Sequence, residues 1–235
     1  MEKRPLTFTL FLLRLLSGIT GGVAGMLLGF IVYFILLSII PSGEEGNSLS
    51  ALTIILMAFI GTLSANTVTA LMVTFLDNQK YSRRKTTLLH VFLFNLILFF
   101  VTIPLYLVAL QMDIVKEVAA LHFLLSAFIS ALIMEVVAGY EYSLLGIYSV
   151  SLGIFVSICI AFFVLAAGAS PLTITLGSMP AVWFILQVVG GLTELIYDNF
   201  LRYYGTDALN ATTDLGGDME VEAKDEDEDE EESNS

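Results

Sequence analysis

The fold follows from stretches such as residues 15–40, LLSGITGGVAGMLLGFIVYFILLSII, which contain no charged side chain. About 20 predominantly apolar residues are enough for a helix to cross the roughly 30 Å hydrocarbon core of a bilayer. A helix is favoured there because it satisfies its own backbone hydrogen bonds. Six stretches reach this length, and they cover residues 15–40, 51–76, 88–110, 118–138, 144–167 and 180–201. The sequence therefore predicts an all-α integral membrane protein, a bundle of six transmembrane helices surrounded by the lipid bilayer.

The composition agrees with this class of protein. Hydrophobic residues make up 57% of the 235-residue chain and charged residues only 14%, and the mean hydropathy is +0.85. Ordinary soluble domains and disordered chains are more polar than this. The formal net charge is −13, but residues 207–232 account for −12 of it, with thirteen acidic residues and one lysine. Because the rest of the chain is close to neutral, no strong field is expected to attract nucleic acid.

Lysine and arginine residues indicate the orientation of the helices, because short loops rich in these residues stay on the cytoplasmic side. With a cytoplasmic N-terminus, nine basic residues fall on that side: Lys3, Arg4, Arg14, Lys80, Arg83, Arg84, Lys85, Arg202 and Lys224. Only Lys116 falls outside. The first apolar run is far longer than a signal-peptide core of about 7–15 residues, so we expect it to be retained. The sequence thus predicts a multi-pass protein of the cell membrane with both termini in the cytoplasm.

Three regions are expected along the chain: a cytoplasmic or interfacial N-terminal segment (1–14), the transmembrane domain (15–204) and a cytoplasmic tail (205–235). The tail is too acidic and too poor in apolar residues to fold alone, so we expect it to be disordered. It is either a solvated segment or a recruiting site for a basic partner. Between the fifth and sixth spans, residues 168–179 are expected to form a loop that leads to a helix beginning at Pro180. A dipping segment and the first part of a kinked sixth helix are the alternatives.

Small residues recur on one side of the first span. Gly18, Gly22, Gly25 and Gly29 lie at intervals of three or four residues. Such a stripe lets helix backbones approach closely, which favours association where lipid offers no hydrophobic driving force. We expect these glycines to pack against other helices of the same chain. A docking face for another membrane protein, or for a second copy in a homo-oligomer, is the alternative.

A few polar side chains fall inside the predicted spans, where a carboxylate facing hydrocarbon costs about 2.5–3.5 kcal/mol. Asn66 lies near the middle of the second span, and Glu135 lies near the inner end of the fourth. Gln187, Glu194 and Asp198 recur at helical spacing on the sixth. We interpret these five residues as a candidate path for a substrate or for protons. Structural hydrogen bonds and ion pairs are the alternative interpretation, above all for Asn66.

Charged or titratable residues also fall at a similar depth near the inner ends of several spans. They are Arg14, Asp77, His90, Glu135, Glu194 and Asp198. They form either a polar layer at the inner mouth of the bundle or a set of interfacial residues whose side chains snorkel to water.

The sequence carries no signature of catalysis. It lacks the nucleotide-binding, phosphotransfer, metalloprotease and serine-hydrolase motifs, so neither an enzyme nor a cofactor is predicted. Cys159 is the only cysteine, and no second ligand at suitable spacing accompanies His122. No metal site is therefore predicted, and His122 is expected to be a hydrogen-bonded packing residue.

The six-span plan with both termini inside, together with the small-residue first helix, is similar to that of small substrate-binding membrane subunits, such as the vitamin-binding components of energy-coupling-factor transporters. This resemblance covers the topology and the first helix. It implies a small-solute transport protein or a membrane subunit of a transport complex. The alternative is a non-catalytic scaffold or assembly component that recruits partners through its glycine-rich helix and its acidic tail.

Overall fold

The computed structural model describes residues 8–39, 45–77, 80–81, 83–138 and 143–196, which are helical except for short connections. The helices are α1 (Phe8–Ile39), α2 (Glu45–Leu76), α3 (Arg84–Met112), α4 (Val115–Ile133), the π-helix η1 (Met134–Ala138), α5 (Ser143–Ala166) and α6 (Pro171–Ile196). No strand occurs among these residues. Six helices are long and apolar enough to cross a membrane, η1 being the end of the fourth. The prediction of an all-α protein with six such helices is confirmed.

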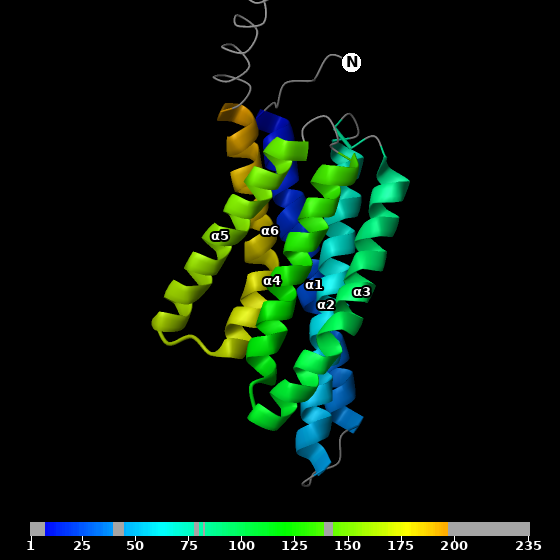
Figure 1. Cartoon of the computed structure of the whole chain (residues 1–235), viewed down its shortest axis with the longest axis vertical. Helices are drawn as coiled ribbons and strands as arrows, with labels where there is room; N and C mark the ends of the chain where they lie inside the picture. The colour runs from blue at the N-terminus through cyan, green and yellow to red at the C-terminus, as the bar shows by residue number, and fades with distance from the viewer. Residues whose placement is uncertain (1–7, 40–44, 78–79, 82, 139–142, 197–235) are drawn as a thin grey trace, which may run out of the picture. The chain divides into compact units, whose positions relative to one another are not determined.

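Successive long helices run in opposite directions, so that α1, α3 and α5 begin at the end of the bundle where α2, α4 with η1, and α6 finish (Figure 1). We call this end of the bundle the α1-start end. The chain divides into two compact units, residues 1–193 and residues 194–235. The first unit holds the bundle. The described part of the second unit is residues 194–196, the last turn of α6.

The sixth helix begins earlier than the sequence suggested. Helix α6 starts at Pro171 and continues without interruption through Pro180. The prediction of a loop over residues 168–179 is therefore wrong from Pro171 onward. Residues 171–179 form the first part of the sixth helix. Proline suits a first helical turn, where its missing N–H has no partner to lose. An internal proline is tolerated in a membrane helix because neighbouring groups satisfy the freed carbonyl.

The first helix packs through its glycines. A Cβ atom on Gly18 would lie 2.9 Å from the backbone oxygen of Trp183 on α6, and one on Gly25 would lie 2.4 Å from that of Gly61 on α2. Gly22 approaches the α6 backbone as closely, whereas a Cβ on Gly29 would lie 3.2 Å from the Met57 carbonyl oxygen on α2. Helix α1 therefore lies against α2 and α6 at distances that leave little or no room for a side chain larger than that of glycine. The glycine stripe of α1 is therefore in contact with other helices of the same chain.

The large apolar side chains are either buried in a core or exposed on the outside of the bundle. Phe123, Met179 and Trp183 are almost completely buried in the core. On α5, by contrast, Phe162 and Phe163 expose 71% and 74% of their surface. Large apolar side chains pointing outward along a whole helix are expected when the surrounding medium is lipid. This exposed apolar face is suited to contact with hydrocarbon.

Candidate functional site

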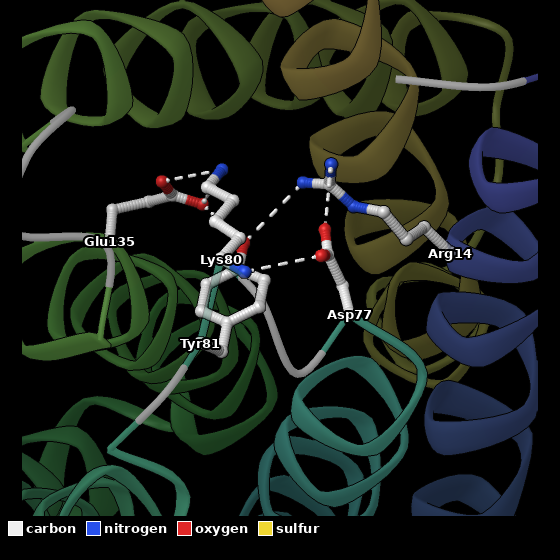
Figure 2. A network of polar contacts seen from close by, with 5 residues as sticks. All are labelled: Arg14, Asp77, Lys80, Tyr81 and Glu135. Carbon is white, nitrogen blue, oxygen red and sulfur yellow. Dashed lines mark hydrogen bonds and ion pairs between the residues drawn. The ribbon is translucent and has the colours of Figure 1, made fainter. Parts of the chain in front are cut away.

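A network of charged side chains joins three parts of the bundle at the α1-start end. Figure 2 shows Arg14 from α1, Asp77 from the end of α2, Lys80 and Tyr81 from the connection to α3, and Glu135 from η1. Arg14 Nη1 lies 3.8 Å from Asp77 Oδ2, and Lys80 Nζ lies 2.9 Å from Glu135 Oε2. These are two ion pairs of opposite-charge residues that are far apart in the sequence. We call the five residues the charged network.

The Tyr81 hydroxyl links the two ion pairs. It accepts a hydrogen bond from Arg14 Nη2 at 3.4 Å and donates one to Glu135 Oε1 at 2.7 Å. A phenol can do both because its oxygen is at once a donor and an acceptor. Lys80 Nζ also donates to Glu135 Oε1 at 3.2 Å, and the Lys80 backbone N–H lies 3.4 Å from Asp77 Oδ1. The contacts form one continuous chain from Arg14 to Glu135.

Local structure brings these side chains together. The Tyr81 N–H bonds to the Asp77 carbonyl at 3.0 Å, which turns the chain directly after α2. On the opposite side, Glu135 lies on the π-helical turn, a deviation that occurs frequently at functional sites. Gly146 on α5 leaves room for this carboxylate, since a Cβ there would lie 2.7 Å from Glu135 Oε2. A turn, a π-helix and a glycine therefore determine where the network forms.

The network is shielded although it is charged. The side chains of Arg14 and Asp77 expose 3% and 10% of their surface, and those of Lys80 and Glu135 expose 11% and 12%. Two positive and two negative groups make the ion pairs neutral as a set. Removing one partner from a buried pair leaves an uncompensated charge, which costs far more than the intact pair contributes. Each member therefore depends on the others.

A small cavity lies beside the network. Its volume is about 20 Å³, and it is lined by Arg14, Tyr81, Ala131, Met134, Glu135, Ser149, Val150, Trp183, Leu186, Gln187 and Gly190. This space is enough for one water-sized group. Gln187 is 7% exposed, and its Oε1 has no hydrogen-bond partner among the described residues. The cavity thus places an unsatisfied acceptor next to paired charges.

A second polar cluster lies deeper in the bundle. Asn66 Nδ2 donates to Asn95 Oδ1 at 2.8 Å and to Ser126 Oγ at 2.6 Å, and Asn95 Nδ2 donates to Ser130 Oγ at 2.8 Å. Trp183 Nε1 donates to Asn66 Oδ1 at 2.8 Å. These bonds connect α2, α3, α4 and α6 through Asn66. Because both ends of the Asn66 amide are bonded within the bundle, its contacts are those of a structural interhelical link.

Trp183 connects this cluster with the cavity. Its indole N–H bonds to Asn66, and the same residue lines the cavity next to Arg14 and Glu135. The two polar regions are thereby neighbours along α6. A change in the cavity is expected to reach the amide cluster through this side chain.

The structure brings together some of the residues that the sequence singled out. Glu135 and Gln187 line one cavity, whereas Asn66 belongs to the neighbouring amide cluster. Glu194 lies in the last described turn of α6, in the second compact unit, and Asp198 lies outside the described residues. Of the expected layer of charged residues, Arg14, Asp77 and Glu135 join the network.

His90 from that expected layer has a different contact. Its Nδ1 lies 2.7 Å from the Thr86 carbonyl one turn back on α3. The other histidine, His122, pairs with Thr102 through a ring nitrogen 3.0 Å from the hydroxyl and packs against Phe99 and Tyr106. Among the described residues, no group of three or more His, Cys, Asp or Glu side chains could hold a metal ion.

Sequence reasoning missed several participants. Lys80 was used only to orient the helices, and Tyr81 was not considered, although it directly follows Lys80. Asn95 is the only amide side chain in the described α3 span before Gln111, and a lone polar group in an apolar helix is a recognisable signal. Trp183 gave no such signal, because a single tryptophan is common in apolar helices.

Six apolar helices and a shielded polar interior make this chain a multi-pass membrane protein. No family model, curated protein or solved structure matches the chain. Its activity therefore has to be argued from its own residues.

Proposed function

We propose that this protein is a small-solute transport protein or the membrane subunit of a transport complex. The observation that supports the proposal is the charged network beside a cavity inside an apolar bundle. Ionisable groups at such places are costly, and in membrane proteins they commonly mark the paths of substrates or ions. Buried ion pairs also contribute little net stability compared with apolar packing, so stability alone is a weak reason for them.

The geometry suggests how the network acts in transport. Its two ion pairs and the Tyr81 hydroxyl join α1, the α2–α3 connection and η1. Breaking and remaking these contacts would let α1 and η1 separate at the α1-start end. Alternating access in transporters consists largely of such rigid-body movements around a fixed site. In this proposal the network closes one end of the solute path, and the Gln187 cavity lies just behind it.

The proposal includes a location and partners. Lysines and arginines on the loops favour a cell-membrane protein with both termini in the cytoplasm. The chain is non-enzymatic in this proposal and works without a cofactor or nucleic acid. Its partners are the bilayer and, in a transport complex, another membrane protein or a second copy. A basic cytoplasmic partner would bind the acidic tail, which lies outside the described residues.

The alternative role, a membrane scaffold, has less support. Its basis in the glycine stripe is weakened because Gly22 and Gly25 contact α6 and α2 of the same chain. The acidic tail remains the basis for this alternative. Deleting residues 224–235 and measuring retention of co-purifying proteins tests it directly.

Transport is tested with the purified full chain in liposomes. The vesicles are given a defined mixture of amino acids, sugars, nucleosides and vitamins, and uptake is measured by mass spectrometry against empty liposomes. Glu135→Gln should lower uptake of any transported solute at least about tenfold, the effect of about 1.4 kcal/mol on a barrier. The matched control is Glu117→Gln, an exposed carboxylate on α4, the helix that η1 continues. No uptake by the wild type, or full uptake by Glu135→Gln, would reject the proposal.

A further inference from the structure

The cavity is lined by Gln187, an uncharged side chain whose buried acceptor oxygen makes no hydrogen bond within the described part of the chain. Gln187 Oε1 is buried and accepts no hydrogen bond from any described residue. A buried carbonyl oxygen without a donor costs about 1–3 kcal/mol, so native structures normally provide a partner. The cavity that Gln187 lines has a volume of about 20 Å³. The geometry therefore calls for a hydrogen-bond donor of about the size of a hydroxyl group or of the NH₂ end of an amide.

The neighbouring charges decide what kind of donor fits. The Arg14 guanidinium, paired with Asp77, lines the same cavity, and the Lys80 ammonium contacts Glu135 in the cavity wall. Because the charges of the wall already neutralise one another, an added cation would lie beside the Arg14 guanidinium without a counter-charge of its own. An anion would face the Glu135 carboxylate, and an anion without an O–H or N–H group could not donate to a carbonyl oxygen. A neutral O–H or N–H group satisfies the acceptor without disturbing either ion pair.

Two further side chains suit a neutral group. The Ser149 hydroxyl on α5, which can donate or accept, lines the cavity opposite α6. The Trp183 side chain adds an aromatic wall. Polar and apolar groups thus share the lining of this cavity.

We infer that this cavity is the subsite for the terminal hydroxyl or carboxamide of a neutral polar solute, held by donation to Gln187 Oε1. The inference rests on the proposed transport function and names the class of its substrate. Since the cavity takes only one such group, the rest of the solute extends outside it. Charged solutes of equal size are excluded by the paired charges in the wall.

The test uses small probes that differ in charge more than in size. Acetamide, acetate and ethylammonium have similar volumes, and ethylene glycol supplies a neutral hydroxyl. The full chain in lipid nanodiscs is titrated with each probe while the fluorescence of Trp183 is recorded. This residue is the only tryptophan of the chain and lines the cavity. Acetamide or ethylene glycol should produce a saturable change, and acetate and ethylammonium should produce none over the same range.

Gln187→Leu removes the acceptor with little change in volume and keeps the reporter. The apparent affinity for the neutral probe should fall at least about tenfold. Gln111→Leu, at an exposed position on α3, is the matched amide-to-leucine control and should bind like the wild type. Equal responses to the charged probes, or an unchanged affinity in Gln187→Leu, would overturn the inference. A response to neither neutral probe would show that the site takes water only and would also overturn it.

Uptake into liposomes separates this inference from the transport proposal. Gln187-dependent binding of a neutral probe without uptake of any solute would leave the subsite standing and reject transport. Uptake that persists in Gln187→Leu and extends to charged solutes would leave transport standing and reject the subsite.

Discussion

Replacing Gly22 with alanine tests the close packing of α1 in the most direct way. A Cβ at this position would lie 2.4 Å from the Pro180 Cα and 2.6 Å from the Met179 carbonyl oxygen. Ordinary van der Waals contact begins at 3.4 Å, so about 1 Å is missing on the α6 side. Both neighbouring atoms belong to the backbone and cannot rotate away. Either α1 or α6 therefore has to move.

Two opposing effects determine how much Gly22→Ala changes the free energy of unfolding. Extra atoms in a well-packed interior typically destabilise by about 1–3 kcal/mol. Alanine, on the other hand, favours a helix over glycine by up to about 1 kcal/mol. We expect Gly22→Ala to lower the free energy of unfolding by about 1–2 kcal/mol. Gly177→Ala on α6 is the matched control, because a Cβ there meets nothing within 4 Å and only the helix preference remains.

The assay is reversible unfolding in mixed lipid–detergent micelles with increasing dodecyl sulfate, followed by Trp183 fluorescence. Gly29→Ala belongs in the same series, because its nearest contact, the Met57 carbonyl oxygen at 3.2 Å, predicts a smaller loss than at Gly22. The expected order of stability is Gly177→Ala, then Gly29→Ala, then Gly22→Ala. If Gly22→Ala were as stable as Gly177→Ala, the packing of α1 against α6 described above would be refuted.

Three further experiments examine the polar interior. Asn66→Leu removes three interhelical hydrogen bonds, and at about 0.6 kcal/mol each it should cost about 2 kcal/mol in the same unfolding assay; a loss no larger than that of the exposed Gln111→Leu would contradict the amide cluster. Lys80→Met and Glu135→Gln should each lower the free energy of unfolding by more than half the loss of the double variant, because each single change leaves the other residue without its ion-pair partner. If the two single losses added up to the loss of the double variant, the two residues would not interact. Gly146→Ala places a Cβ 2.6 Å from the Glu135 Cβ, so it should reduce liposome uptake as Glu135→Gln does, and unaffected uptake would show that the carboxylate does not need its present position.

Much of the fold could be predicted from local sequence. Residues 88–110, for example, are long and apolar enough to span a bilayer, and α3 contains all of them. The start of the sixth helix could not be located, because Pro171 and Pro180 are both compatible with a helix start. Whether Pro180 is accommodated inside a helix depends on the neighbouring helices. The local sequence around Pro171 and Pro180 does not show which helices these are.

The candidate site was predictable only in part. Arg14, Asp77 and Glu135 were identifiable as costly charges at a similar depth, and Gln187 as a polar group on an apolar helix. Their partners were not identifiable, because Lys80 looked like an ordinary loop lysine. Its ion pair with Glu135 requires η1 to approach the α2–α3 connection. Sequence position gives depth in the membrane but not which helices are neighbours.

The sequence by itself determined that six helices are long and apolar enough to cross a membrane and that few polar groups lie within them. Length and composition suffice for this, because the bilayer imposes its thickness on each segment independently. The tertiary structure alone decided which polar groups meet. Tyr81 reaches Glu135 across 54 positions, and Trp183 reaches Asn66 across 117. Such pairs depend on how the helices pack, and that packing depends on atomic contacts such as those of Gly22 with α6.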